Sequence, residues 1–252
     1  CSCSKAVYGG RCMCAFNKKW QIKANLCDYD AVSLYPSAMA RLWTVEGKPK
    51  VIEQEQLNMD FLSKQTAYIV QIKITEVRKH YPFPLIVQKK DGLNLNDDNI
   101  TEPIMMIVDN IYLEDLINFQ NIEFELIKGY YWDGKKDFRI QEEIKKIFEK
   151  RVEYKKQKNP LQQLYKLIMN SCYGKTIEKP VDKELVYVSG EEKIKKYITR
   201  NYNSITEIIQ IKDSKISAIK QVVPIDQHFN FSLLGIQVLS MSKRIMNEVM
   251  CL

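Results

Sequence analysis

The sequence carries the stretch Asp28-Tyr-Asp-Ala-Val-Ser-Leu-Tyr-Pro-Ser37, in which an acid ends an apolar run and a hydroxyl and a phenol follow. We predict a short strand over Ala24–Asp30 and a helix from Ser33 to Leu42. A carboxylate at a strand end can hold a hard divalent cation, and the start of a helix offers free backbone N–H groups to a phosphate. Asp30 is therefore the expected metal ligand, with the carbonyl of Ala31 as its companion. Taken alone, an acid here is more often a helix N-cap.

A second stretch, Lys166-Leu-Ile-Met-Asn-Ser-Cys-Tyr-Gly174, lies on a predicted helix. On an α-helix, Lys166, Asn170 and Tyr173 fall at positions i, i+4 and i+7, along one face. A cation, an amide and an aromatic ring on one face suit a triphosphate, a sugar or base edge, and a stacked base. Taken alone, this face is more often an ordinary polar surface.

The segment from Lys135 to Lys183 concentrates positive charge. It contains 14 Lys and Arg against 7 Asp and Glu, and this excess of 14 − 7 = +7 equals the net charge of the whole chain. We predict two helices here, the second beginning at Asn159-Pro160, joined as an antiparallel hairpin and ending near Tyr173 with Gly174 after it. Arg151 or Lys155 on the first helix can approach the face of the second. Such a patch favours a polyanionic partner about as strongly as it favours a solvated surface.

The composition is that of a folded α+β protein. The 252 residues are 45% hydrophobic and 27% charged, which allows one large domain or two small ones, and Gly and Pro are too few for a disordered chain. No apolar run is long enough for a membrane span and no signal peptide is recognised, so we expect no membrane partner. Because residue 1 is Cys rather than Met, we expect a fragment or a processed product.

Hydrophobic periodicity predicts the remaining elements. The expected strands are Ala67–Val77, Phe83–Gln88, Ile122–Tyr131, Glu184–Val188, Ser204–Ile211 and Lys215–Val223, and the expected helices are Tyr112–Phe119 and Phe231–Leu252. Between the second and third strands, Lys89–Ile100 is expected to be a loop or hairpin tip.

Seven cysteines include the closely spaced pairs Cys1/Cys3 and Cys12/Cys14. Structural zinc sites use wider pairs, and the chain has only two His, so a zinc site is a minor alternative to reduced thiols in an intracellular protein. The scarcity of His also means that any chemistry should rest on carboxylates, Lys or Tyr.

Two motifs of the family B DNA polymerases are similar to the two stretches, in the same order. Motif A resembles D-x-x-S-L-Y-P, and motif B resembles K-x-x-x-N-S-x-Y-G on the second helix of the basic hairpin. Tyr8-Gly-Gly-Arg11, shortly before motif A, resembles an element of the protein-primed branch. That branch carries an insertion between the motifs that contacts the terminal protein, and Lys64–Val108 is its expected equivalent. The resemblance implies an α+β polymerase palm, a mixed or antiparallel sheet with helices, and a helical-hairpin fingers subdomain. The expected parts are residues 1–63, palm with motif A; 64–134, insertion and return to the palm; 135–180, fingers; and 181–252, palm.

The resemblance implies template-directed DNA synthesis, in which a dNTP is transferred to a primer 3′ hydroxyl with two Mg²⁺ ions, or Mn²⁺ as a substitute. The implied partners are primer–template DNA, dNTPs and a terminal protein that primes synthesis. The implied source is a virus or plasmid, with the protein inside the host cell, in cytoplasm, nucleus or organelle. Asp30 matches the first catalytic aspartate, and Tyr35 matches the residue that packs under the incoming sugar and excludes ribonucleotides.

Two sets of contact residues follow from the resemblance. The nucleotide-binding set is Ser33, Leu34, Tyr35, Arg151, Lys155, Lys166, Asn170 and Tyr173, with Arg151 and Lys155 as alternatives for one cation. The DNA-binding set is Tyr8, Gly9, Gly10, Arg11, Gly174, Lys175, Ser240 and Arg244.

The sequence departs from the family pattern in two places. The second catalytic aspartate belongs to an Asp-Thr-Asp-Ser hairpin that does not occur before Leu252, and Asp28, on the same strand face as Asp30, is a poor substitute. In the element with Ser240 and Arg244, Ser replaces Thr and Lys243 replaces a small residue. We therefore expect a polymerase fragment that is inactive by itself. The alternative is a catalytically inactive DNA- or terminal-protein-binding remnant.

Overall fold

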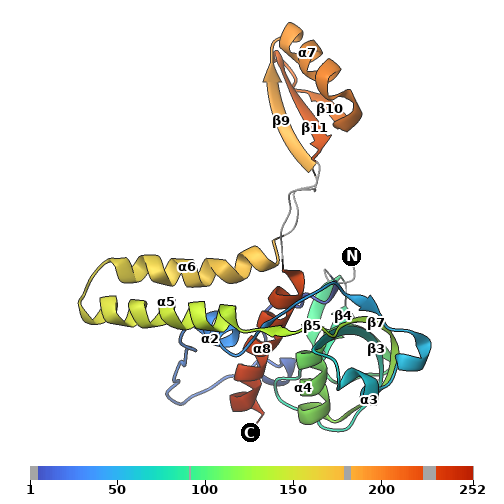
Figure 1. Ribbon diagram of the computed structural model, residues 1–252, viewed down its shortest axis with the longest axis vertical. Coiled ribbons are helices and arrows are strands. Elements are labelled where there is room, and N and C mark those ends of the chain that lie inside the picture. Colours follow the sequence, from blue (N-terminus) through green and yellow to red (C-terminus); the bar gives the residue numbers. More distant parts are fainter. Residues whose placement is uncertain (1–4, 91, 179–182, 224–230, 252) are drawn as a thin grey trace. The chain divides into compact units, whose positions relative to one another are not determined.

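The computed structural model describes residues 5–90, 92–178, 183–223 and 231–251 (Figure 1). These residues form α-helices and antiparallel strands, as the α+β prediction requires. They divide into two compact units, Cys1–Ile177 with Phe231–Leu252, and Glu178–Asn230. Among the described residues, no helix is both long and apolar enough to cross a membrane.

A four-stranded antiparallel sheet lies at the centre of the larger unit. Its strands, in spatial order, are β2 (Lys50–Val51), β7 (Ile122–Trp132), β3 (Ala67–Val77) and β6 (Ile104–Asp109). Strand β3 occupies the predicted residues because its apolar side chains alternate, and Val70, Ile72 and Ile74 are all buried on one face.

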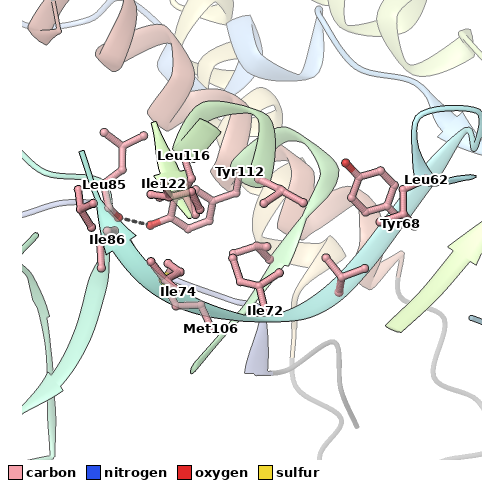
Figure 2. Packing of buried hydrophobic residues seen from close by; sticks show 14 of the residues in the cluster. Leu62, Tyr68, Ile72, Ile74, Leu85, Ile86, Met106, Tyr112, Leu116 and Ile122 are labelled. Carbon is pink, nitrogen blue, oxygen red and sulfur yellow. Dashed lines mark hydrogen bonds between the residues drawn. The ribbon is translucent and has the colours of Figure 1, made fainter. Parts of the chain in front are cut away.

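Helix α4 (Asn110–Gln120) covers this face of the sheet. Figure 2 shows Ile72 and Ile74 of β3 beside Tyr112 and Leu116 of the helix. The buried Tyr112 hydroxyl donates to the carbonyl of Leu85, which satisfies a phenol that would otherwise lose its hydrogen bond to water.

Gly129 of β7 sits where the backbones of β3 and β7 approach closely. A Cβ on this residue would lie 2.4 Å from the carbonyl oxygen of Ile69 and 2.8 Å from a methyl carbon of Val70. The strand pairing shifts register between Gln71 and Ile72, one pair away. Only glycine fits this position without displacing backbone.

Smaller elements complete the sheet region of the larger unit. They are η1 (Ala15–Asn17), η2 (Gln54–Gln56), α3 (Met59–Leu62), the pair β1 (Thr44–Val45) and β8 (Lys136–Asp137), and the hairpin β4 (Val87–Lys90) and β5 (Leu93–Asn96).

Four helices pack together in the rest of the larger unit. They are α2 (Leu34–Met39), α5 (Arg139–Lys156), α6 (Leu161–Thr176) and α8 (Ser232–Met250). Helices α5 and α6 run side by side as the predicted antiparallel hairpin (Figure 1). Their base joins α2 and α8 in a second core that includes Met39, Leu42, Ile144, Leu234 and Val238.

The smaller unit has its own sheet and helix. Strands β10 (Ile205–Gln210), β11 (Ile216–Val222) and β9 (Lys183–Ser189) pair in that spatial order, and α7 (Glu191–Asn201) and η3 (Tyr202–Ser204) lie between β9 and β10 in the chain. The Tyr197 hydroxyl on α7 donates to the Gln221 side chain at 2.8 Å, so the helix covers the face of β11 that carries Gln221. Residues 181–252, expected as one piece of palm, are therefore divided between a separate unit and helix α8.

Several sequence predictions differ from the structure. The strand predicted over Ala24–Asp30 is wrong: its residues are exposed and form neither helix nor strand. A strand needs a neighbour for its N–H and C=O groups, and none of the described strands pairs with this segment. The strand predicted over Phe83–Gln88 begins later, at Val87. Strand β6 and helix α7 were not predicted.

Candidate functional site

The turn before α2 has an unusual backbone conformation. Ser33 has φ 51° and ψ 50°, in the left-handed region that a residue with a side chain seldom adopts. Its carbonyl accepts a hydrogen bond from the N–H of Ser37 at 2.9 Å. Helix α2 is fixed by burial, because Pro36 is buried and Met39 is buried in the second core. The hydroxyl of Ser33 and the ring of Tyr35 are thus set on a rigid support.

The helical hairpin meets this turn through two contacts. The guanidinium of Arg151 on α5 donates from Nη1 to Oγ of Ser33 at 2.8 Å. The ring of Tyr35 stacks on that of Tyr173 on α6, with centroids 4.5 Å apart and planes 6° from parallel. Burial raises the pKa of Tyr173 to about 12, so its phenol is neutral. The structure therefore brings together four of the residues expected to bind nucleotide.

The sequence left Arg151 and Lys155 as alternatives for one cation, and their positions in the structure differ. Arg151 is half-buried against Ser33, and its Nε is buried without a hydrogen-bond partner in the described structure. Lys155 lies one helical turn further along α5 and is exposed. Arg151, not Lys155, is the cation that contacts the turn.

Lys166 and Asn170 lie with Tyr173 on α6, one turn apart as predicted, but both are exposed. Gly174 and Lys175 were expected after the helix; they lie inside its last turn, which ends at Thr176. Leu34 is the half-buried first residue of α2.

Asp30 and Asp28 lie in the exposed segment before α2, and Ala31 is half-buried beside them. In the part of the chain that the structure describes, no three His, Cys, Asp or Glu side chains gather in a way that could hold a metal ion. The described residues thus offer Asp30 as a single carboxylate and do not form a complete divalent-cation site.

The described cysteines give the zinc alternative no support. Cys12 and Cys14 are exposed, and they are not part of any group of metal ligands among the described residues. Cys1 and Cys3 lie outside the described residues.

The tetrapeptide Tyr8–Arg11 contacts β6, the segment before β4 and helix α8. The Tyr8 hydroxyl accepts from the N–H of Ile107 at 3.2 Å. Arg11 donates to the carbonyl of Phe83 at 2.8 Å and to Oδ1 of Asn247 at 2.7 Å. Gly9 and Gly10 are exposed between these two fixed residues.

Ser240 and Arg244 of α8 are engaged inside the protein. Ser240 is buried and donates to Oδ1 of Asp109 at 2.7 Å, and Arg244 donates to Asp115 at 2.6 Å. Burial raises the pKa of both aspartates to about 6, although these hydrogen bonds oppose the shift. Both residues thus hold α8 against β6 and α4, a role that the resemblance did not indicate.

Comparison with known proteins identifies the family. Residues 2–245 match the family model described as "DNA polymerase type B, organellar and viral". The chain belongs to this family. Its resemblance to family B polymerases, seen in the motifs, is confirmed.

One curated relative and two solved structures are informative about this type B polymerase chain. A "DNA polymerase" of Acidianus bottle-shaped virus (isolate Italy/Pozzuoli) is 25% identical over 166 residues, which cover 58% of this chain and 23% of the relative. An orthorhombic crystal form of Phi29 DNA polymerase superposes with a TM-score of 0.51 at 19% identity, covering 82% of this chain and 32% of that one.

Phi29 DNA polymerase complexed with primer-template DNA superposes with a TM-score of 0.50 at 18% identity, covering 84% of this chain and 31% of that one. At these identities the likeness shows a polymerase fold. The chain spans about a quarter of the viral relative and about a third of the Phi29 enzyme.

Three residues of this type B polymerase chain contact expected site residues although their sequence pattern did not indicate it: Asp109, Lys243 and Asn247. Lys243 was noted only as a departure from a motif, and the local pattern carries no signal for the other two. Their contacts join segments far apart in sequence, as between Lys243 and Tyr8.

Proposed function

We propose that the protein is a template-directed DNA polymerase, and that this chain supplies part of its palm and its fingers. The observation that carries the proposal is the junction of the two motifs: Arg151 donates to Ser33 while Tyr35 stacks on Tyr173. The resemblance expects the incoming nucleotide between motif A and the fingers, which is where these contacts lie.

The residues at this junction suit the parts of a dNTP. Arg151 holds a planar, charged guanidinium at this junction and would donate to a triphosphate oxygen, with Lys166 as a second cation. The Tyr35 ring would lie under the sugar, where a 2′ hydroxyl clashes, and Tyr173 would stack on the base. Together they orient the α-phosphate toward the primer terminus.

In the proposed reaction, the primer 3′ oxygen bonds to the α-phosphorus. The bond from that phosphorus to the oxygen bridging to the β-phosphate breaks, pyrophosphate leaves, and the hydroxyl proton passes to solvent. Arg151 would stabilise the charge that collects on the leaving pyrophosphate. A bound Mg²⁺ would supply further charge neutralisation, and Asp30 with the Ala31 carbonyl is the part of this chain that would ligate it.

We further infer that synthesis is protein-primed and that the gene belongs to a virus or plasmid. The element Tyr8–Arg11 and the insertion Lys64–Val108 support this inference by resemblance, and the relative from a virus agrees with it. Lys64–Val108, which contains β3 and the β4–β5 hairpin, is the proposed contact for a terminal protein, and Tyr8–Arg11 for the template.

Asp30→Ala in the complete gene product tests the proposal. Primer extension with dNTPs should fall at least about a hundredfold, since a ligand for a charge-stabilising cation is lost. Asp60→Ala, at another exposed aspartate, serves as the control and should extend primers like the wild type. Unchanged extension by the Asp30 variant would remove that residue from the catalytic site.

A second candidate function is binding of DNA or of a terminal protein without catalysis. The charge excess of Lys135–Lys183 favours it, because a basic hairpin binds phosphates whether or not chemistry follows. Salt dependence of DNA binding supports both functions equally. Magnesium-dependent incorporation of a labelled dNTP occurs only if the protein is a polymerase.

A further inference from the structure

Lys243 occupies an unusual place on α8. The amine of this half-buried lysine donates to the backbone carbonyl of Tyr8 at 2.9 Å. It also lies over two aromatic rings, 4.8 Å from the centroid of Tyr112 and 5.6 Å from that of Tyr8. Burial lowers the pKa of Lys243 to about 8, while the charge of Asp109 opposes the shift. The side chain therefore acts as a donor inside the fold rather than as a surface charge.

Tyr8 is held by other groups besides this amine. Its hydroxyl accepts from the N–H of Ile107 on β6, and its ring meets the Tyr112 ring edge-on with centroids 5.8 Å apart. Among the described residues, Lys243 is the hydrogen-bond donor that holds the Tyr8 carbonyl, the group that leads into Gly9. The lysine thus controls the peptide unit at which the two glycines begin.

The same face of α8 also holds the far end of the tetrapeptide. Asn247 lies one helical turn after Lys243, and its Oδ1 accepts from Arg11 at 2.7 Å. Both ends of the tetrapeptide are consequently attached to one rigid element. A flexible Gly-Gly pair that is fixed at both ends has far fewer conformations than a free one.

The fold itself does not need glycine at these two positions. A Cβ on Gly9 or Gly10 would meet no atom within 4 Å, and neither residue is among the glycines with positive φ in the described structure. Both are exposed. The absence of side chains instead leaves a stretch of bare backbone that a partner can approach closely.

We propose that Lys243 is a positioning residue for nucleic-acid binding. Through its hydrogen bond to the Tyr8 carbonyl, it holds Gly9 and Gly10 in one conformation, so that their backbone is already ordered before DNA binds. This inference rests on the proposed contact between Tyr8–Arg11 and the template. It assigns a role to the residue at which this sequence departs from the family pattern.

The test compares Lys243→Met with Lys48→Met in the complete gene product. Methionine keeps the length and the packing of the stem but removes the donor, whereas Lys48 is an exposed lysine before β2 whose loss removes the same charge. For Lys243→Met we expect the Kd for primer–template DNA to rise about tenfold, because DNA binding must then order the two glycines without the help of this internal hydrogen bond. The loss should appear in the KM for primer–template and not in kcat at saturating DNA.

Two further measurements separate positioning from a general loss of stability. The NMR order parameters of the Gly9 and Gly10 amides should fall in Lys243→Met and return toward the wild-type values in Lys243→Arg, which restores a donor. The hydrogen exchange of β3 amides should be unchanged in both variants. If Lys243→Met destabilises the fold, the partial rescue of DNA affinity by Lys243→Arg still decides the question.

The outcomes distinguish this inference from the proposed function. If the wild type neither binds nor extends primer–template DNA, the proposed function fails. If the wild type does both and Lys243→Met matches Lys48→Met in Kd and in the order parameters of the two glycines, the positioning role fails while the polymerase function stands. Lower order parameters at the two glycines without a change in Kd likewise overturn the inference, since the fixed glycines then do not serve DNA binding.

Discussion

Replacing Arg151 with Ala tests most directly whether this residue binds the triphosphate in the proposed nucleotide site. Arg151 is half-buried, donates to Ser33 at 2.8 Å, and has a buried Nε with no partner in the described structure. Its guanidinium is therefore fixed in place beside the turn, where its charge can meet an anionic ligand. A triphosphate oxygen is the acceptor that the proposed function supplies.

The expected size of the effect follows from one lost charge-assisted hydrogen bond. Such a bond contributes about 1.5–3 kcal/mol, and each 1.4 kcal/mol is a factor of ten. The KM for a dNTP should therefore rise about 10- to 150-fold in Arg151→Ala. Arg151→Lys, which keeps the charge but loses the planar fork, should fall between this variant and the wild type.

The assay is steady-state incorporation of one nucleotide on a primed template, with dNTP concentration varied and DNA saturating. Lys155→Ala is the matched control, because it removes an exposed cation one turn away on the same helix. The control should change KM less than about threefold, as expected for an exposed charge. An unchanged KM for Arg151→Ala, or a larger rise for Lys155→Ala, would refute the assignment of the phosphate-binding cation.

Further predictions address the sugar pocket, packing and pH. Tyr35→Val should admit ribonucleotides, measured as the ratio of kcat/KM for rNTP and dNTP; unaltered discrimination would contradict its place under the sugar. Gly129→Ala should lower the free energy of unfolding by about 1–3 kcal/mol, because the added Cβ would lie 2.4 Å from the Ile69 carbonyl oxygen. Gly174→Ala, at a helical position with no atom near the added Cβ, should raise the free energy of unfolding by about 0.5–1 kcal/mol. Denaturant titration of both variants and the wild type measures these changes. Burial raises the pKa of Asp109 to about 6, so the protonated carboxyl stabilises the fold fully below about pH 4, the pKa of an aspartate in the unfolded chain, and this stabilisation is lost as the pH rises through 6. Asp109→Asn should therefore lose less unfolding free energy between pH 4 and 7 than the wild type. Equal losses would show that Asp109 is not the group responsible.

Secondary structure was predictable where one face of an element is buried over many residues. Strand β3 shows this, since its alternation matches the face that is buried. Helices α5 and α6 were predicted from the helical spacing of their apolar residues, although, of their described residues, α5 buries Ile144 alone and α6 buries Met169 alone. Strand β6 was missed because Ile104–Asp109 is a short apolar run without alternation, which does not distinguish a buried strand from a loop. The strand predicted over Ala24–Asp30 had the right pattern but has no described neighbour to pair with.

The sequence by itself determined the chemistry that the site can offer. Each motif is a local pattern, and the order of the two along the chain identified the family. Helical spacing placed Lys166, Asn170 and Tyr173 along α6, because it depends only on residues close together in the chain.

Only the tertiary structure decided which of these groups meet. In the structure Arg151, and not Lys155, contacts Ser33, and Lys243 donates to Tyr8, which is 235 residues away in the sequence. Contacts of this kind depend on how far each helix is rotated about its axis and where it crosses its neighbour. Those quantities are set by packing of the whole core, on which the local sequence pattern carries no information.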